Sequence, residues 1–350
     1  MRIKKEVRKI VASVLAFLMV VSLIPVNSLM TKANAASKTT FEGGKTVEDG
    51  TWKGWTWNVF GSSTDVTKAF ATDTGNGGVT LEVTGDKGKI NGSASDQGLN
   101  TFLYELDKSY DFTITAQAKV DTLAANAQAA FGLTIRDNVG AHGNTAKLTA
   151  DKNNFAFVGG YGNQAASGHG NAGYKTTALA HTRLGESPEV GGTYDLAIQK
   201  VGDSVKLYFN GEVAAECSAD DLITDNAMYV GLFAARNAKV TFNNVKLAYT
   251  QDSSSVKVTT NVTAPKKTTY CAGNTYEDVD LTGFKATVSV DGKEREITAS
   301  DCVVDMSNDP FAEVTEAGKL NLLYLGQTIE VPITVIKEVV SDMYLSLIHI

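Results

Sequence analysis

The chain has 350 residues, of which 32 are Lys or Arg and 39 are Asp or Glu, so its formal net charge is −7. This acidic balance argues against nucleic acid and against an anionic membrane surface as the main partner. The length predicts more than one domain, and the three cysteines (Cys217, Cys271 and Cys302) are too few for a disulfide scaffold.

The first 35 residues have the pattern of a secretory signal peptide. Five basic residues lie within the first nine positions, an apolar run follows from Ile10 to Val26, and Ala33-Asn34-Ala35 matches a small-residue cleavage site. The alternative is a membrane anchor, because the apolar run is nearly long enough to span a bilayer. We expect export with cleavage and no membrane contact afterwards. Cleavage would remove six basic residues and one acidic residue, which changes the net charge to −12.

Residues 41–250 contain many short β-type runs separated by turn residues, without a helical period. In Phe112–Val120, apolar and polar residues alternate, which predicts an antiparallel strand with one buried face and one solvent-facing face. Gly202-Asp203 and Asn210-Gly211 predict tight turns. This pattern predicts an all-β fold, a sandwich or a barrel. Further strands are expected at 78–84, 101–106, 153–158, 194–201 and 205–209.

The stretch Tyr229–Leu247 predicts two strands joined at Arg236-Asn237-Ala238. We expect them to be adjacent or nearly adjacent in the sandwich, with a β-bulge at Asn243-Asn244. Ala129–Asn138 repeats part of this pattern, because a Gly-Leu pair is again followed by an Arg at the end of the strand. The two Gly-Leu strands therefore predict one antiparallel core.

A polar segment, Gln251 to Ser255, predicts a linker between two domains. A second β-pattern follows and is complete by about residue 337. Its length of roughly 80 residues suits a small sandwich domain.

Arg136 and Asp137 are candidate binding residues. Phe131, Leu133 and Ile135 share one face of their strand, so Arg136 belongs to the other face, which we expect to be open with Asp137 at its edge. A guanidinium makes paired hydrogen bonds to sugar hydroxyls or to a uronate carboxylate. The alternative is a surface ion pair between Arg136 and Asp137 that holds a loop.

The glycine-rich segment 159–174 and three tryptophans supply the other candidates. The segment predicts either a lid that carries Tyr161, His169 and Tyr174 to a ligand or a disordered connection, and His181 and Arg183 would line the same edge. Trp52, Trp55 and Trp57 alternate, so they would share one face of an extended segment. They are expected either to stack on sugar rings or to pack in the core. We expect two of the three in the core, with Trp57 as the candidate for binding.

Three segments in order resemble the C-terminal half of the concanavalin A-like lectin and glucanase sandwiches: Thr193–Ile198, Val205–Gly211 and Val240–Val245. Residues 41–250 as a whole resemble the non-catalytic sandwich module of secreted bacterial pectate lyases. The resemblance implies a concanavalin A-like β-sandwich that binds carbohydrate, with a structural calcium ion left open and no other cofactor expected. The further matching segments are Trp55–Trp57, Lys87–Ile90 and Phe131–Asp137.

The catalytic pattern of the glucanases is incomplete in this chain. Those enzymes carry two glutamates and an aspartate at E-x-D-x-E spacing on one strand. Here Asp107 follows Glu105, but Ser109 stands where the second glutamate belongs. We therefore expect no catalytic site in this chain. Whether the longer protein that contains it is a polysaccharide lyase is left open.

The second β-pattern resembles a bacterial immunoglobulin-like domain of the group 3 kind, over residues 256–337. The motif "Y-x-x-G-x-x-x-D-L-T-G" is matched in order from Tyr270 to Gly283, and Val290-Asp291-Gly292 suits a hairpin turn. Such domains act as spacers or adhesive modules. Cys271 and Cys302 depart from the family, and a disulfide between them is left open.

Two functions follow as hypotheses. The first is a secreted, non-catalytic carbohydrate-binding module with an immunoglobulin-like spacer, and the polysaccharide that it binds is expected to be of the pectin type. The second is a cell-surface adhesin or structural protein built of β-sandwich modules. An enzyme of unknown type is a third reading.

The last six residues, 345–350, match the translation of a transposase end sequence used in sequencing libraries. A natural apolar tail is the alternative. We expect these residues to be an artefact, so that His349 is not a ligand, and we expect the natural protein to continue with a catalytic module beyond about residue 344.

Overall fold

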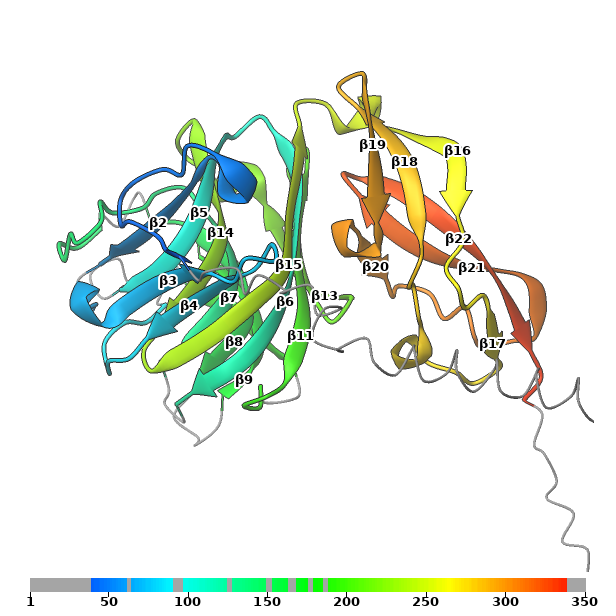
Figure 1. Ribbon diagram of the computed structural model, residues 1–350, viewed down its shortest axis with the longest axis horizontal. Helices are drawn as coiled ribbons and strands as arrows, with labels where there is room; N and C mark the ends of the chain where they lie inside the picture. The colour runs from blue at the N-terminus through cyan, green and yellow to red at the C-terminus, as the bar shows by residue number, and fades with distance from the viewer. Residues whose placement is uncertain are drawn as a thin grey trace, which may run out of the picture. The chain divides into compact units, whose positions relative to one another are not determined.

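The computed structural model describes residues 39–61, 64–90, 97–124, 128–148, 153–162, 168–175, 179–184 and 188–338. The expected signal peptide and the expected artefact at 345–350 lie outside these ranges and stay predictions. The fold is all-β, as predicted (Figure 1). Within the described ranges, the helices are one short α-helix, α2 (Ala219–Leu222), and five turns of 3-10 helix. No helix in the described part of the chain combines the length and the apolar character needed to cross a bilayer.

Two antiparallel sheets form the first sandwich. The eight-stranded sheet has the order β1 (Thr39–Thr40), β3 (Ala69–Asp73), β4 (Val79–Val83), β15 (Ala238–Thr250), β6 (Asp111–Leu123), β11 (Thr193–Val201), β12 (Ser204–Phe209) and β13 (Glu212–Ser218). The seven-stranded sheet has the order β10 (Leu179–Leu184), β9 (Gly168–Lys175), β8 (Phe155–Gly162), β7 (Ala130–Arg136), β14 (Ala227–Ala235), β5 (Leu99–Asp107) and β2 (Trp55–Phe60).

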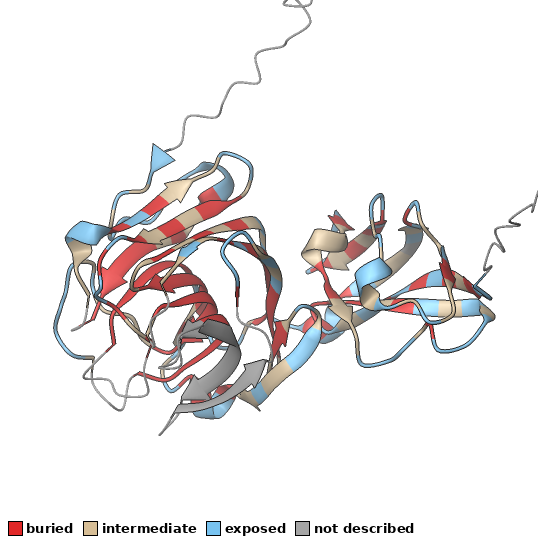
Figure 2. Ribbon diagram, turned by 90° about the horizontal axis from the view of Figure 1, so that it is seen from below, coloured by how far each residue is buried: buried red, intermediate tan, exposed pale blue. Residues whose placement is uncertain are grey.

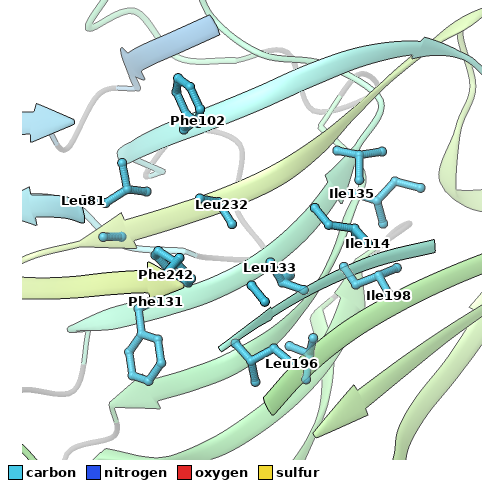
Figure 3. Packing of buried hydrophobic residues seen from close by; sticks show 14 of the residues in the cluster. Leu81, Phe102, Ile114, Phe131, Leu133, Ile135, Leu196, Ile198, Leu232 and Phe242 are labelled. Carbon is cyan, nitrogen blue, oxygen red and sulfur yellow. The ribbon is translucent and has the colours of Figure 1, made fainter. Parts of the chain in front are cut away.

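The core lies between these sheets because every second residue of each strand faces the opposite sheet. Ile114, Leu196 and Phe242 of the eight-stranded sheet pack in one buried cluster with Leu133 and Leu232 of the seven-stranded sheet (Figure 3). The predicted apolar row of β6 is buried, and the predicted hairpin turns join β11 to β12 and β12 to β13. Figure 2 shows how burial concentrates on the strands and leaves many turns exposed.

The prediction that the strands around Arg236-Asn237 are neighbours is wrong. β14 pairs with β5 and β7 in the seven-stranded sheet, whereas β15 pairs with β4 and β6 in the eight-stranded sheet. The connection makes its backbone hydrogen bonds to other segments, because Asn237 N–H donates to Gly85 O (2.8 Å) and Ala124 N–H donates to Asn237 O (3.0 Å). The chain therefore crosses from one sheet to the other at this turn. The two Gly-Leu strands, β7 and β14, belong to one antiparallel sheet, as predicted, and the structure adds that they pair directly. The bulge after Asn243 is confirmed.

The face of the seven-stranded sheet that points away from the core is covered. Phe60, Phe155, Phe157 and Phe233 on this face are fully buried in a second, smaller apolar cluster. Ile90 and the partly buried Val139 and Leu148, which lie in connections between strands, complete that cluster. This covering removes the open face that the strand pattern of Phe131–Ile135 predicted.

A second sandwich follows β15. Its three-stranded sheet has the order β16 (Lys257–Thr263), β18 (Lys285–Val290) and β19 (Lys293–Thr298), and its four-stranded sheet has the order β17 (Thr269–Cys271), β22 (Gln327–Ile336), β21 (Thr315–Tyr324) and β20 (Val303–Asp305). These strands share their own buried cluster, which includes Val288, Leu322 and Val331. The predicted turn at Asp291-Gly292 joins β18 to β19, and both residues have positive φ angles.

The segment predicted as a linker is an ordered turn. Ser253–Ser255 form a 3-10 helix, η6, in which Ser254 N–H donates to the Asp252 carboxylate (2.9 Å). Ser253 is buried, and its carbonyl oxygen accepts a hydrogen bond from Gln327 Nε2 (2.9 Å). The sequence Asp252-Ser253-Ser254 is typical of a capped helical turn. The polar composition of the segment led to the linker prediction instead.

Candidate functional site

Arg136 lies at the end of β7, on the face predicted for it, but it is fully buried instead of open to solvent. Its Nη2 donates to Gln97 Oε1 and to Asn153 Oδ1, both at 2.7 Å, and its Nε donates to Asn138 O at 3.2 Å. The guanidinium carbon also lies 5.0 Å from the centre of the Phe155 ring and 5.6 Å from that of Phe60. Burial lowers the pKa of this guanidinium to about 10, so it is still charged at neutral pH.

Asp137 is also buried, and its side chain has other partners than the Arg136 guanidinium. Its Oδ1 accepts from Asn154 N–H (2.9 Å) and its Oδ2 accepts from the Thr224 hydroxyl (3.1 Å). Burial raises the pKa of this carboxyl, which the hydrogen bond from Thr224 and the charge of Arg136 partly oppose. The two expectations for this pair, a sugar-binding arm on an open face and a surface ion pair, are both wrong, because both side chains hold buried connections in place.

The three tryptophans all belong to the core between the sheets. Trp55 and Trp57 lie on β2 and Trp52 lies in the 3-10 turn η2 (Gly50–Trp52). Trp57 is 8% exposed and its Nε1 donates to the buried Asn100 Oδ1 at 2.7 Å. The expectation that Trp57 is available for sugar stacking is therefore wrong, since the hydrogen bond and the burial hold it inside.

The described parts of the glycine-rich segment, residues 159–162 and 168–174, lie in the paired strands β8 and β9. In β8 and β9, Tyr161 is paired with His169, and in β9 and β10, His181 is paired with Gly173 and Arg183 with Asn171. The backbone positions of Tyr161, His169, His181 and Arg183 are thus in phase along the edge of the seven-stranded sheet. Their side chains lie outside the described part of the structure, so their role stays a prediction.

A pocket of about 370 Å³, here called the junction pocket, lies between the eight-stranded sheet and the second sandwich. Gln117 of β6, Asp195 of β11 and Tyr208 of β12 line it on one side. Tyr276 and Ser300 line it on the other side, the first in η7 (Tyr276–Asp278) and the second in η8 (Ala299–Asp301).

The junction pocket exists because the second sandwich packs on the outer face of β6, which was predicted to face solvent. Thr113 and Thr115 on that face are buried. Leu325 N–H donates to Thr113 Oγ1 (3.2 Å), and Thr115 Oγ1 donates to Ser300 O (2.6 Å). The alternation of β6 predicted this polar row correctly, but not its cover, which comes from residues far along the chain.

Tyr208 is the most deeply buried polar side chain of the junction pocket, at 2% exposure. Its hydroxyl is not among the buried polar atoms without a partner in the described part of the chain, and it opens onto the pocket that Tyr208 lines. Burial, together with the nearby carboxylates of Asp305 and Glu216, raises the pKa of Tyr208 to about 12. The hydroxyl therefore keeps its proton at physiological pH and is available as a donor.

Amide groups at the rim add further hydrogen-bonding capacity. Asn244 Nδ2 donates to Gln117 Oε1 (3.0 Å), and Asp195 N–H donates to Asn210 Oδ1 (2.9 Å). Both asparagines have positive φ angles, Asn210 at the β12–β13 turn and Asn244 at the bulge of β15. The sequence marked both residues as turn or bulge formers and gave no sign that they meet at one pocket.

The three cysteines are free thiols, so the structure contains no Cys271–Cys302 disulfide. Cys302 is buried beside the junction pocket, and burial raises the pKa of its thiol. Within the described ranges, no group of three or more His, Cys, Asp or Glu side chains is arranged to hold a metal ion.

No family profile matches the chain. A curated relative, "Pectate lyase L" of Thermoclostridium stercorarium, is 29% identical over 282 residues, which is 80% of this chain and 21% of the relative. The chain thus spans about a fifth of that relative's length. The 282 aligned residues exceed the 250 that end with β15, so the match extends into the second sandwich.

Solved structures that resemble parts of the chain include the following three. The carbohydrate binding module CBM66 from Bacillus subtilis is 14% identical, with 61% of this chain and 96% of that chain covered and a TM-score of 0.30. Lectin UEA-II complexed with galactose is 10% identical, with 60% and 98% covered and a TM-score of 0.36. Alginate lyase AlyC3 in complex with dimannuronate is 12% identical, with 55% and 89% covered and a TM-score of 0.35.

Proposed function

We propose that this chain is a non-catalytic polysaccharide-binding part of a secreted protein that degrades plant polysaccharides of the pectin type. The observation that carries the proposal is the 29% identity to a pectate lyase over 80% of this chain. Because the match covers only 21% of the relative, most of that relative, and with it room for a separate catalytic module, lies outside the matched part.

The second sandwich is the spacer in this proposal, of the bacterial immunoglobulin-like kind. Two small sheets with their own buried cluster support this role, since such a unit needs little from its neighbour to be stable. The apolar N-terminal segment with its small-residue cleavage site supports secretion.

The edge formed by β8, β9 and β10 is the first candidate for contact with an acidic glycan. Tyr161, His169, His181 and Arg183 are in phase there, and they include an arginine and two histidines. A guanidinium recognises a uronate carboxylate through paired hydrogen bonds.

Affinity electrophoresis of the full chain in gels that contain polygalacturonate, galactan, arabinan, xylan or mannan tests the proposal. We expect retardation by at least one pectic polysaccharide relative to a gel without polysaccharide, and no release of unsaturated products from polygalacturonate. Absence of retardation in every gel would refute polysaccharide binding and favour a structural or adhesive role. Release of unsaturated products would refute the non-catalytic role.

A further inference from the structure

We propose that the junction pocket binds a neutral sugar residue of the polysaccharide and excludes uronates. This inference rests on the proposed polysaccharide-binding function and adds both a site and a class of sugar. The site lies on the eight-stranded sheet, where it meets the second sandwich, and not on the β8–β10 edge.

The polar groups of the junction pocket match sugar hydroxyls, which both donate and accept hydrogen bonds. Tyr208 is a buried side chain that lines the pocket, and its hydroxyl opens onto the pocket, where it can donate to a ligand. A sugar hydroxyl in the pocket would accept this hydrogen bond in place of water. The Gln117 and Asn210 amides present further donors, and the Asp195 carboxylate presents an acceptor.

The charge of the pocket decides between a neutral sugar and a uronate. None of the residues that line the pocket is Lys, Arg or His, whereas Asp195 carries a carboxylate. Asp305 and Glu216 act on Tyr208 with the same sign, since both raise its pKa. A uronate would bring its carboxylate into this field without a cation to pair with, which is unfavourable in a partly buried site.

The apolar part of the lining suits the C–H face of a sugar ring. Leu281, Val279 and Met306 contribute aliphatic surface next to the aromatic side chains of Tyr208 and Tyr276. Tyr276 is held in place, because its hydroxyl lies within hydrogen-bond distance of two carbonyl oxygens, Asn308 O (2.8 Å) and Asp305 O (3.0 Å). Aromatic rings offer both apolar contact and a polar tip, as sugar binding requires.

The volume limits how much glycan enters. About 370 Å³ lies near the lower end of the range of small-molecule sites, which is about 300–1,000 Å³. The pocket therefore holds a chain end or a side branch, and the rest of the polysaccharide stays outside.

The test is a titration of the full chain with two tetrasaccharides, galactotetraose as the neutral probe and tetragalacturonate as the anionic probe. Arabinotetraose, xylotetraose and mannotetraose extend the neutral set. Tyr208→Phe removes only the hydroxyl, and Gln117→Leu removes a second donor at nearly constant size. We expect each change to raise the Kd of the bound neutral probe about three- to tenfold, as the loss of one neutral hydrogen bond predicts. The affinity for tetragalacturonate should not change in either variant.

Tyr229→Phe is the matched control, because it makes the same change on a half-buried tyrosine of the seven-stranded sheet. Thermal melting of each variant checks that the fold is kept. Neutral-probe affinity that is the same in Tyr208→Phe, Gln117→Leu and the control would overturn the pocket but leave polysaccharide binding standing. Tetragalacturonate binding that weakens in Tyr208→Phe would overturn the neutral specificity. A chain that binds no probe and is retarded by no polysaccharide would overturn the proposed function as well.

Discussion

Replacing Arg136 by Ala should destabilise the first sandwich strongly and leave glycan binding without a direct effect. The side chain makes two charged hydrogen bonds of 2.7 Å, to Gln97 and Asn153, in a fully buried site. Hydrogen bonds to charged groups contribute about 1.5–3 kcal/mol each, and the two aromatic contacts add to them. Removing the buried guanidinium also removes the free-energy cost of its desolvation, which offsets part of this loss. We therefore expect a decrease of about 3–5 kcal/mol in the free energy of unfolding.

Urea unfolding followed by tryptophan fluorescence measures this change, because Trp52, Trp55 and Trp57 all lie in the core of the same sandwich. For a sandwich of this size, about 3–5 kcal/mol corresponds to a decrease in Tm of roughly 6–20 °C. The control is Lys119→Ala, which removes a cation that is half exposed on β6 and pairs with Asp121 at 3.8 Å. We expect less than about 1 kcal/mol from that surface pair.

A decrease for Arg136→Ala that is no larger than the decrease for Lys119→Ala would refute the argument from buried hydrogen bonds. An unchanged Tm combined with lost glycan retention would restore the open-face interpretation of Arg136. Arg136→Lys gives a graded check, since lysine keeps the charge but cannot reproduce the geometry of the guanidinium.

Three further predictions concern single sites. Gly132→Ala should cost more than about 3 kcal/mol or prevent folding, because a methyl group would overlap a carbonyl oxygen of β8. His142 should make stability fall with decreasing pH: burial keeps its folded pKa below its ordinary value of 6.5, so the unfolded chain takes up the proton first. His142→Gln should reduce the difference between urea midpoints at pH 7.5 and 5.5, since the ring's Nδ1 accepts from Val59 N–H only when unprotonated. Thr115→Val should cost about 1–2 kcal/mol in thermal unfolding, because the Ser300 carbonyl loses its hydrogen bond.

Each of these predictions has its own control and contrary outcome. The control for Gly132→Ala is Gly202→Ala, which places a methyl group in open space and should cost only about 1–2 kcal/mol because of the positive φ of Gly202. Equal costs at the two glycines would contradict the argument that the methyl group at residue 132 overlaps the carbonyl oxygen of β8. If the urea midpoint changes equally between pH 7.5 and 5.5 in the wild type and in His142→Gln, then His142 does not cause the pH dependence of stability. Thr122→Val, at an exposed position of the same strand, should be nearly neutral, and a cost equal to that of Thr115→Val would show that the bond to Ser300 contributes nothing.

Local signals determined much of the fold without help from the rest of the chain. The turns at Gly202-Asp203, Asn210-Gly211 and Asp291-Gly292 were predicted because few other residue pairs tolerate their backbone angles. The strand Phe112–Val120 was predicted because its alternation allows one face to be buried. The all-β architecture and the positions of many strands along the chain follow from such signals.

The tertiary structure alone decided which strands pair and which polar side chains are covered. The Arg236-Asn237 turn is as compatible with a hairpin as with a crossing between sheets, and partners more than a hundred residues away along the chain select the crossing. Arg136 is on the face that the alternation predicts, but whether a face is open depends on connections that no local pattern describes. The junction pocket is the clearest case. Gln117 and Tyr208 lie on strand faces that point away from the core of the first sandwich, and a site is enclosed only because Tyr276 and Ser300 pack opposite them. Side-chain alternation is a property of the strand, whereas enclosure is a property of segments brought together by the fold.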